Sequence, residues 1–140
     1  MSQHLPCRDR VPLDDPLELH PLPDSTSWSG SIAYLDRDGV LNIGSENYVN
    51  SPSEVILLPN VANCIARLRR SGIRIAVVTN QSPIGRGYWD SENLALIHDR
   101  IQNLLLREDK DAILDLILHS PYLPNQNAWA RKPNPGMLEA

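Results

Sequence analysis

The chain has 140 residues, of which 41% are hydrophobic and 21% are charged, and its formal net charge is −4. This length accommodates one domain at most, and the negative net charge argues against a general nucleic-acid-binding protein. No stretch approaches the ~20 apolar residues of a transmembrane helix, and the N-terminus lacks the basic and apolar regions of a secretory signal. With two cysteines, nothing indicates a disulfide framework, so a cytoplasmic location is expected.

Residues 1–29 are expected to form a proline-rich tail. Acidic and apolar side chains alternate there without a stable period, and prolines interrupt any helix or central strand. The prolines are Pro6, Pro12, Pro16, Pro21 and Pro23. We therefore predict an extended or disordered segment, followed by one domain over residues 30–140.

From residue 31 onward the predicted elements alternate between strands and helices. The apolar run over residues 31–35 indicates a first strand over residues 31–36. Residues 60–71 read as a helix, with an asparagine at its start and Gly72 just past its end. Residues 73–79 are rich in β-branched side chains, which indicates a second strand buried in a parallel sheet.

The same alternation continues toward the C-terminus. A second helix is predicted from residue 91, because apolar side chains recur at helical spacing between residues 94 and 105. A third strand is predicted over residues 112–118, and Pro135 suits the first turn of another helix. Alternating strands and helices predict an α/β fold with a doubly wound parallel sheet. Ligands bind such sheets beyond the carboxyl ends of the strands, where three polar segments fall.

The first polar segment, residues 36–42, follows the first strand and reads Asp-Arg-Asp-Gly-Val-Leu-Asn. Asp36 and Asp38 share a face because residues i and i+2 of a strand point the same way. Both carboxylates can therefore approach one phosphate and one cation, with one acting as nucleophile and the other exchanging protons. Gly39 permits the backbone to turn. The same pattern also occurs in calcium loops and at solvated strand ends.

The second segment follows the second strand and begins Thr79-Asn80-Gln81-Ser82. Its hydroxyls, amides and backbone N–H groups could cradle phosphate oxygens. Arg86 adds a cation that could either contact a substrate or remain solvated. A polar turn that caps the next helix is the alternative interpretation.

The third segment, residues 131–137, follows the third predicted strand and leads into the last predicted helix. Lys132 would offset the charge of two aspartates and stabilise a transferring phosphoryl group. Arg131 could bind a phosphate through two parallel hydrogen bonds. The alternative is a basic turn before a helix.

Together, residues 36–42, 79–88 and 131–137 resemble the motifs of the haloacid dehalogenase (HAD) phosphatase superfamily, and more narrowly its heptose bisphosphate and histidinol phosphate phosphatases. The resemblance covers residues 31–140. It implies that Asp36 is the nucleophile, that Asp38 is the acid and base, and that Lys132 completes the catalytic set. It also implies Mg²⁺ on the Asp36 carboxylate and the Asp38 backbone carbonyl. The implied substrate-binding residues are Thr79, Asn80, Gln81, Arg86 and Arg131.

The chain departs from the family pattern in two places. Where this branch often carries a zinc loop of the form Cys-x-His and Cys-x-Cys, residues 120–122 and 128–130 offer no thiolate or imidazole, so we predict no zinc. The fourth family motif, an acidic strand end that completes the magnesium site, has no counterpart here. We therefore expect a domain that is incomplete at its C-terminus, with the third magnesium carboxylate missing.

The resemblance implies a magnesium-dependent phosphomonoesterase that works through an aspartyl-phosphate. D-glycero-D-manno-heptose 1,7-bisphosphate is the expected substrate, histidinol phosphate is the alternative, and a polynucleotide 3′-phosphate is more distant. A phosphate-binding fragment without turnover is the non-catalytic alternative. We expect a monomer whose partner is a small phosphorylated metabolite, with neither nucleic acid nor membrane as a partner.

Overall fold

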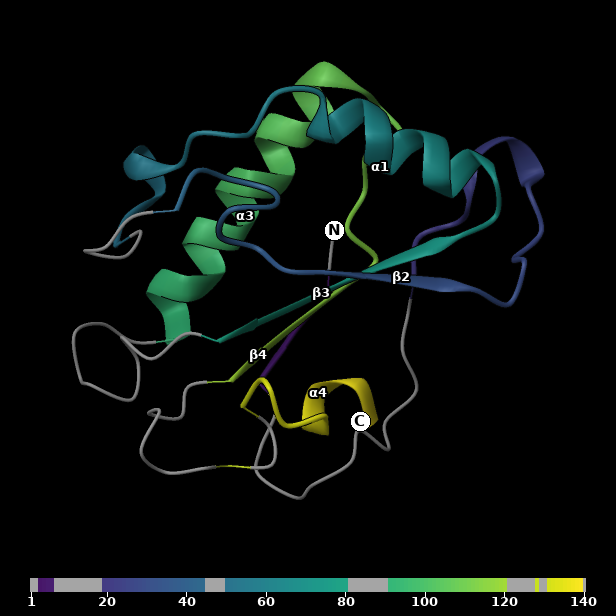
Figure 1. Ribbon diagram of the computed structural model, residues 1–140. Coiled ribbons are helices and arrows are strands. Elements are labelled where there is room, and N and C mark those ends of the chain that lie inside the picture. The colour runs from purple at the N-terminus through teal and green to yellow at the C-terminus, as the bar shows by residue number, and fades with distance from the viewer. Residues whose placement is uncertain are drawn as a thin grey trace.

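A computed structural model of the protein describes residues 3–6, 19–44, 50–80, 91–120, 128 and 131–139. The strands are β1 (Gln3–Pro6), β2 (Ile32–Leu35), β3 (Arg74–Asn80) and β4 (Leu116–Ser120). The α-helices are α1 (Val61–Arg70), α3 (Ser91–Glu108) and α4 (Gly136–Glu139). Two short 3-10 helices are η1 (Pro23–Ser25) and η2 (Pro52–Glu54). The strands form one sheet in the order β1-β4-β3-β2, and every neighbouring pair is parallel. Figure 1 shows α1 and α3 on one side of this sheet and α4 on the other, which confirms the predicted α/β arrangement. No helix in the described ranges is long and apolar enough to cross a membrane.

The predicted strands and helices that precede β4 are confirmed, with small shifts at their ends. Strand β4, however, begins at Leu116 rather than at residue 112. The buried Gln102 side chain of α3 explains this difference, because it donates to the backbone carbonyl of Ala112 and accepts the backbone N–H of Leu114. Those backbone groups are therefore satisfied by a side chain instead of by a neighbouring strand.

The hydrophobic core lies between the sheet and the two longer helices. Its buried residues come from β3, β4, α1, α3 and the loops beside them: Leu41, Val55, Ala62, Ile65, Ala66, Ile75, Val77, Ile97, Ile101, Leu105, Ala112, Leu114 and Ile117. Each fully buried side chain of leucine or isoleucine size contributes about 1.5–3 kcal/mol. Packing in this core fixes the position of the sheet relative to α1 and α3, and therefore the place where the strands end.

Two stretches of the N-terminal segment, residues 3–6 and 19–29, lie within the described part of the structure. Gln3–Pro6 adds strand β1 beside β4. Farther along, the backbone carbonyl of Pro21 accepts a hydrogen bond from buried Arg69, and that of His20 accepts one from Arg74. Both arginines also pair with the buried carboxylate of Asp115. These two stretches of residues 1–29 are therefore held by long-range pairing, and where the domain begins stays a prediction.

Gly72 gives a test of how closely residues 27–29 pack on the domain. Its φ is +85°, and an added Cβ would lie 2.6 Å from the backbone oxygen of Ser27. We expect Gly72→Ala to destabilise the fold by more than about 1 kcal/mol, because left-handed backbone strain adds to this clash. Urea denaturation measures the effect. An unchanged midpoint would contradict the packing of Ser27 against Gly72.

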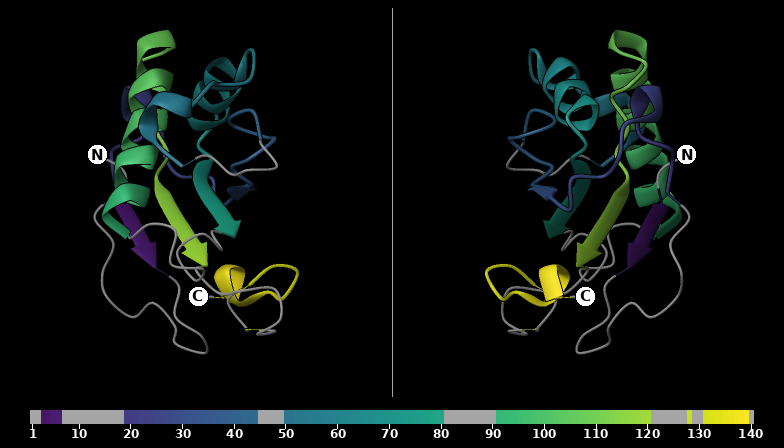
Figure 2. Two further views of the ribbon diagram at one scale, coloured as in Figure 1. Left: turned by 90° about the vertical axis from the view of Figure 1, so that its left-hand side faces the viewer. Right: turned by 90° about the vertical axis from the view of Figure 1, so that its right-hand side faces the viewer.

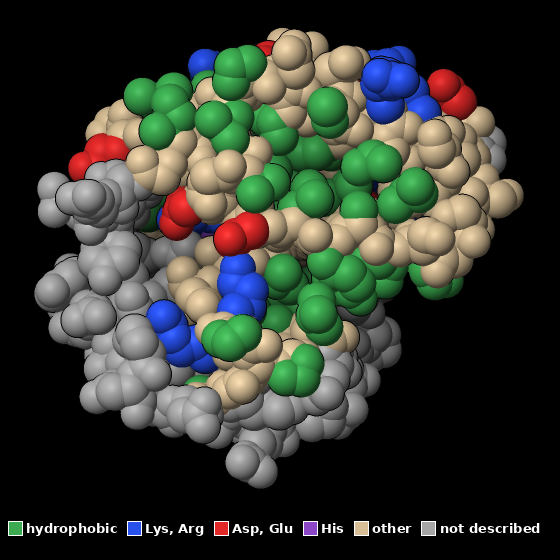
Figure 3. Space-filling model, in the orientation of Figure 1, with side chains coloured by type: hydrophobic (Ala, Val, Ile, Leu, Met, Phe, Trp, Pro, Cys, Tyr) green, Lys and Arg blue, Asp and Glu red, His purple; other side chains and the backbone are tan. Residues whose placement is uncertain are grey.

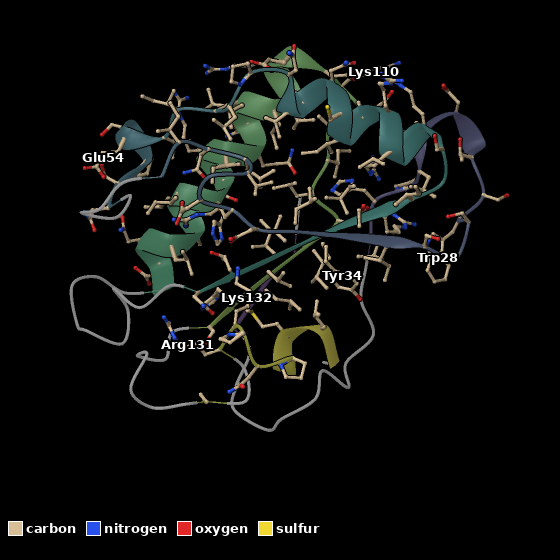
Figure 4. The ribbon with its side chains drawn as sticks, in the orientation of Figure 1. Trp28, Tyr34, Glu54, Lys110, Arg131 and Lys132 are labelled. Atoms are coloured by element: carbon tan, nitrogen blue, oxygen red, sulfur yellow. The ribbon has the colours of Figure 1, made fainter. Side chains whose placement is uncertain are left out.

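Strand β2 lies at the edge of the sheet, and within the described residues it pairs with β3 alone. Its side chains Ile32 and Tyr34 are 41% and 45% exposed, and Trp28 nearby is 55% exposed. Figure 4 labels Tyr34 and Trp28 on the side of β2 away from α1, and Figure 3 shows hydrophobic side chains gathered on this face. An apolar pocket of about 260 Å³ opens there, with Trp28, Ile32 and Leu116 in its wall.

Candidate active site

The first and third polar segments meet at one carboxylate. Asp36 directly follows β2, and its Oδ1 lies 2.8 Å from Nζ of Lys132. The same oxygen accepts the backbone N–H of Arg37 at 2.8 Å. The side chains of Asp36 and Lys132 are 48% and 32% exposed, so a molecule from solvent can reach this pair. In Figure 4, Lys132 lies between the strands and α4, and Figure 2 shows α4 at the end toward which the strand arrows point.

The second and third segments are held together by a reciprocal pair of hydrogen bonds. Asn80, at the end of β3, donates from Nδ2 to the backbone carbonyl of Lys132 at 3.2 Å. The backbone N–H of Lys132 in turn donates to Oδ1 of Asn80 at 3.0 Å. Asn80 thus fixes the backbone of the residue whose ammonium group pairs with Asp36. Asn80, at the end of β3, therefore positions the ammonium group of Lys132 beside Asp36, the candidate nucleophile at the end of β2.

Asp38 lies on a tight turn that is closed by backbone hydrogen bonds. The carbonyl of Arg37 accepts the N–H of Leu41 at 2.8 Å, and the N–H of Gly39 donates to the carbonyl of Asn42 at 2.7 Å. Gly39 has a φ of +84°, which is the turn geometry that the sequence predicts for it. This turn brings Nδ2 of Asn42 to 3.0 Å from Oδ1 of Asp38.

The residue between the two aspartates has a role that the sequence analysis did not predict. The Arg37 side chain is 1% exposed and forks onto Asp38, with Nε 3.0 Å from Oδ1 and Nη2 3.1 Å from Oδ2. Its Nη1 lies 3.2 Å from Nε2 of His98, on α3. Burial lowers the pKa of the Arg37 guanidinium, and the nearby carboxylates of Asp38 and Asp36 oppose that shift.

The other predicted binding residues are only partly placed. Thr79 is buried at the end of β3, beside Asn80. Arg131 is half-buried next to Lys132, and its backbone N–H donates to the carbonyl of Ala128 at 3.0 Å. Gln81 and Arg86 lie outside the described residues. A phosphate cradle formed by these residues therefore stays a prediction.

The atoms at the end of β2 that could coordinate a metal ion are oxygens. Mg²⁺ prefers carboxylate and carbonyl oxygens and binds through one or two carboxylates, so the Asp36 carboxylate and the Asp38 backbone carbonyl fit this ion by chemistry. Of the positions where the family often has zinc ligands, Ser120 and Ala128 are described and both are buried. Neither offers a zinc ligand, and the absence of zinc stays a prediction.

No protein-family model matches the chain. It is 41% identical over 110 residues to the D-glycero-β-D-manno-heptose-1,7-bisphosphate 7-phosphatase of Pseudomonas aeruginosa, which covers 79% of this chain and 61% of that protein. A probable D-glycero-D-manno-heptose-1,7-bisphosphate 7-phosphatase of Thermoplasma volcanium is 31% identical over 105 residues, which covers 75% of this chain and 70% of that protein. The chain thus spans about three fifths of the length of the Pseudomonas relative.

Solved structures agree with these relatives. The D,D-heptose 1,7-bisphosphate phosphatase of B. bronchiseptica, crystallised with magnesium and phosphate, superposes with a TM-score of 0.72 at 38% identity, covering 77% of this chain and 59% of that one. A putative HAD-like phosphatase of Mesorhizobium loti gives a TM-score of 0.69 at 37% identity, covering 81% and 56%. Sequence identity and fold together show that the chain belongs to the heptose bisphosphate phosphatase family of HAD-like phosphatases.

Proposed function

We propose that this chain carries the site of a magnesium-dependent phosphomonoesterase for a small sugar phosphate, with D-glycero-D-manno-heptose 1,7-bisphosphate as substrate and its 7-phosphate as the group removed. The observation that carries the proposal is the contact between Asp36 and Lys132, whose backbone is held by Asn80. A half-exposed carboxylate beside a fixed ammonium group is suited to attack on an anionic phosphoryl group. Relatives and solved neighbours that bear this activity in their names support it.

The residues divide the reaction between them. An oxygen of Asp36 attacks phosphorus and forms the aspartyl-phosphate, while the bond from phosphorus to the sugar oxygen breaks. Asp38 gives its proton to that leaving oxygen and then takes a proton from the water that attacks the aspartyl-phosphate. Hydrolysis releases inorganic phosphate and restores the Asp36 carboxylate. Lys132 stabilises the negative charge spread over the phosphoryl oxygens.

The proposed cofactor is Mg²⁺, held by the Asp36 carboxylate and the Asp38 backbone carbonyl. When bound, the ion neutralises charge on the phosphoryl group and orients it. The proposed substrate contacts are Thr79, Asn80 and the segment that contains Gln81 and Arg86, together with Arg131. Two arginines suit a sugar that carries two phosphates. A monomer in the cytoplasm remains our prediction.

Phosphate release from three substrates tests the proposal. The chain with Mg²⁺ should release phosphate from the heptose bisphosphate faster than from histidinol phosphate or from an oligonucleotide 3′-phosphate. Release from histidinol phosphate alone would overturn the heptose assignment. Binding of inorganic phosphate without turnover of any substrate would replace the enzyme with the binding-only alternative.

Lys132→Met should lower kcat/KM by about 10²–10³-fold, because it removes a fixed positive charge from the developing transition state. The matched control is Lys110→Met, since Lys110 is an exposed lysine on the loop between α3 and β4. Figure 4 shows Lys110 at the top of the molecule, well away from Lys132 below the strands. Steady-state phosphate release measures both variants. An equal effect of the two substitutions would show that Lys132 acts only through net charge.

A further inference from the structure

A buried arginine connects the candidate acid and base to helix α3. Arg37 is 1% exposed, although arginine is almost never fully buried unless it is paired. Its neighbours Asp36 and Asp38 are 48% and 36% exposed at their side chains. The run Asp-Arg-Asp thus places two carboxylates near solvent and one guanidinium inside the protein.

The two ends of the Arg37 guanidinium contact different residues. Nε donates to Oδ1 of Asp38 at 3.0 Å, and Nη2 lies 2.9 Å from Oδ1 and 3.1 Å from Oδ2. Such a fork fixes the plane of a carboxylate as well as its position. Nη1 lies 3.2 Å from Nε2 of His98, which is itself 1% exposed. Because α3 is anchored in the core by Ile97 and Ile101 on either side of His98, the imidazole is a rigid support for the fork.

The chemistry of this contact specifies the state of the histidine. Arginine has donors and no acceptor, so Nε2 of His98 must accept the hydrogen bond from Nη1. This hydrogen bond corresponds to the tautomer of His98 that carries its proton on Nδ1. Asn42 also donates to Oδ1 of Asp38 at 3.0 Å. Two side chains, Arg37 and Asn42, thus hold the Asp38 carboxylate.

We propose that Arg37, supported by His98, is a positioning residue that fixes the orientation of the Asp38 carboxylate for proton transfer. The proposal rests on the phosphatase function proposed above. Arg37 donates to Asp38 and lies against His98, whereas Lys132 is held by Asp36 and Asn80. Loss of Arg37 or His98 should therefore affect proton transfer more than the binding of phosphate.

Paired variants at His98 separate this role from a purely structural one. His98→Gln keeps an acceptor near the position of Nε2, whereas His98→Leu removes it and keeps an apolar side chain. We expect His98→Leu and Arg37→Met to lower kcat by about 10–100-fold, as supporting partners of a site residue typically do. His98→Gln should stay within about threefold of the wild type, and the dissociation constant for inorganic phosphate should change less than threefold in all three.

A second readout does not depend on activity. In protein labelled with ¹³C at aspartate Cγ, with the Asp38 signal assigned through Asp38→Asn, this signal should shift in His98→Leu and Arg37→Met and stay in place in His98→Gln. An Asp38 signal unmoved by both disruptive variants would overturn the proposal, as would a shifted signal with unchanged kcat. If the wild type releases no phosphate, the proposed function fails, while the ¹³C signal still decides whether His98 positions Asp38. Should Arg37→Met not fold, the His98 pair decides alone.

Discussion

Asp36→Asn is expected to lower the rate of phosphate release by about a thousandfold or more. An amide is a far weaker nucleophile than a carboxylate, so the aspartyl-phosphate cannot form, and loss of a nucleophile removes most of an enzyme's rate enhancement. Asparagine has nearly the same size, and Asp36 is 48% exposed, so the fold should tolerate the change. Steady-state release from the heptose bisphosphate measures the loss.

The control for this experiment is Asp24→Asn. Asp24 is exposed in η1 and has a φ of 49°, a conformation that asparagine readily adopts. Its replacement removes one carboxylate without touching the end of β2, and activity should not change. Intact mass after acid quenching adds a direct observation, since a phosphoryl group should be found on the wild type and not on Asp36→Asn. Full activity of Asp36→Asn would exclude Asp36 as the nucleophile.

The largest effect on stability is expected at Asp115. Its carboxylate is 2% exposed at the side chain and pairs with Arg69, which is 1% exposed, and with Arg74. It also accepts the backbone N–H of Ile75 at 2.8 Å, near the start of β3. Asp115→Ala should lower the free energy of unfolding by about 3–5 kcal/mol, because it leaves a buried guanidinium without its counter-ion. Urea or thermal denaturation measures this loss.

Asp111→Ala is the matched control, because Asp111 pairs with Arg70 at the surface. Solvent screens such a pair, so its removal should shift the denaturation midpoint far less. Loss of Asp115 should also expose residues 19–22 to protease, since Arg69 and Arg74 hold the carbonyls of Pro21 and His20. Equal shifts in the two variants would contradict a special role for the buried network.

The parts of the site that the sequence predicted depend on local pattern and on one rule of topology. The apolar run before Asp36 and the β-branched run before Thr79 indicate parallel strands, and their carboxyl ends meet at one edge of a sheet. The contact between Asp36 and Lys132 at 2.8 Å lies at that edge, as the rule leads one to expect for segments that follow the strands. The clamp formed by Asn80 needs in addition the exact path of the loop before α4.

The parts that the sequence did not predict rely on pairing between distant residues. Arg69 and Asp115 are 46 positions apart, and Arg37 and His98 are 61 apart. No local periodicity encodes which arginine meets which carboxylate. One signal was available for His98, which follows Ile97 and precedes Ile101 at helical spacing on the buried face of α3. A polar residue on such a face needs a buried partner.

The edge position of strand β2 should affect how readily the backbone next to Asp36, the candidate nucleophile, opens to solvent. Within the described residues, β2 has hydrogen-bonded backbone on its β3 side alone, whereas β3 is paired on both sides. Amide hydrogens of β2 should therefore exchange with solvent faster than those of β3, since singly paired backbone opens at lower free energy. Lys132 is tied through Asn80 to β3, which is paired on both sides, and Asp36 follows β2, which is paired with β3. Backbone pairing on the other side of β2 would therefore change the fraction of time that the Asp36 carboxylate spends in contact with the Lys132 ammonium group.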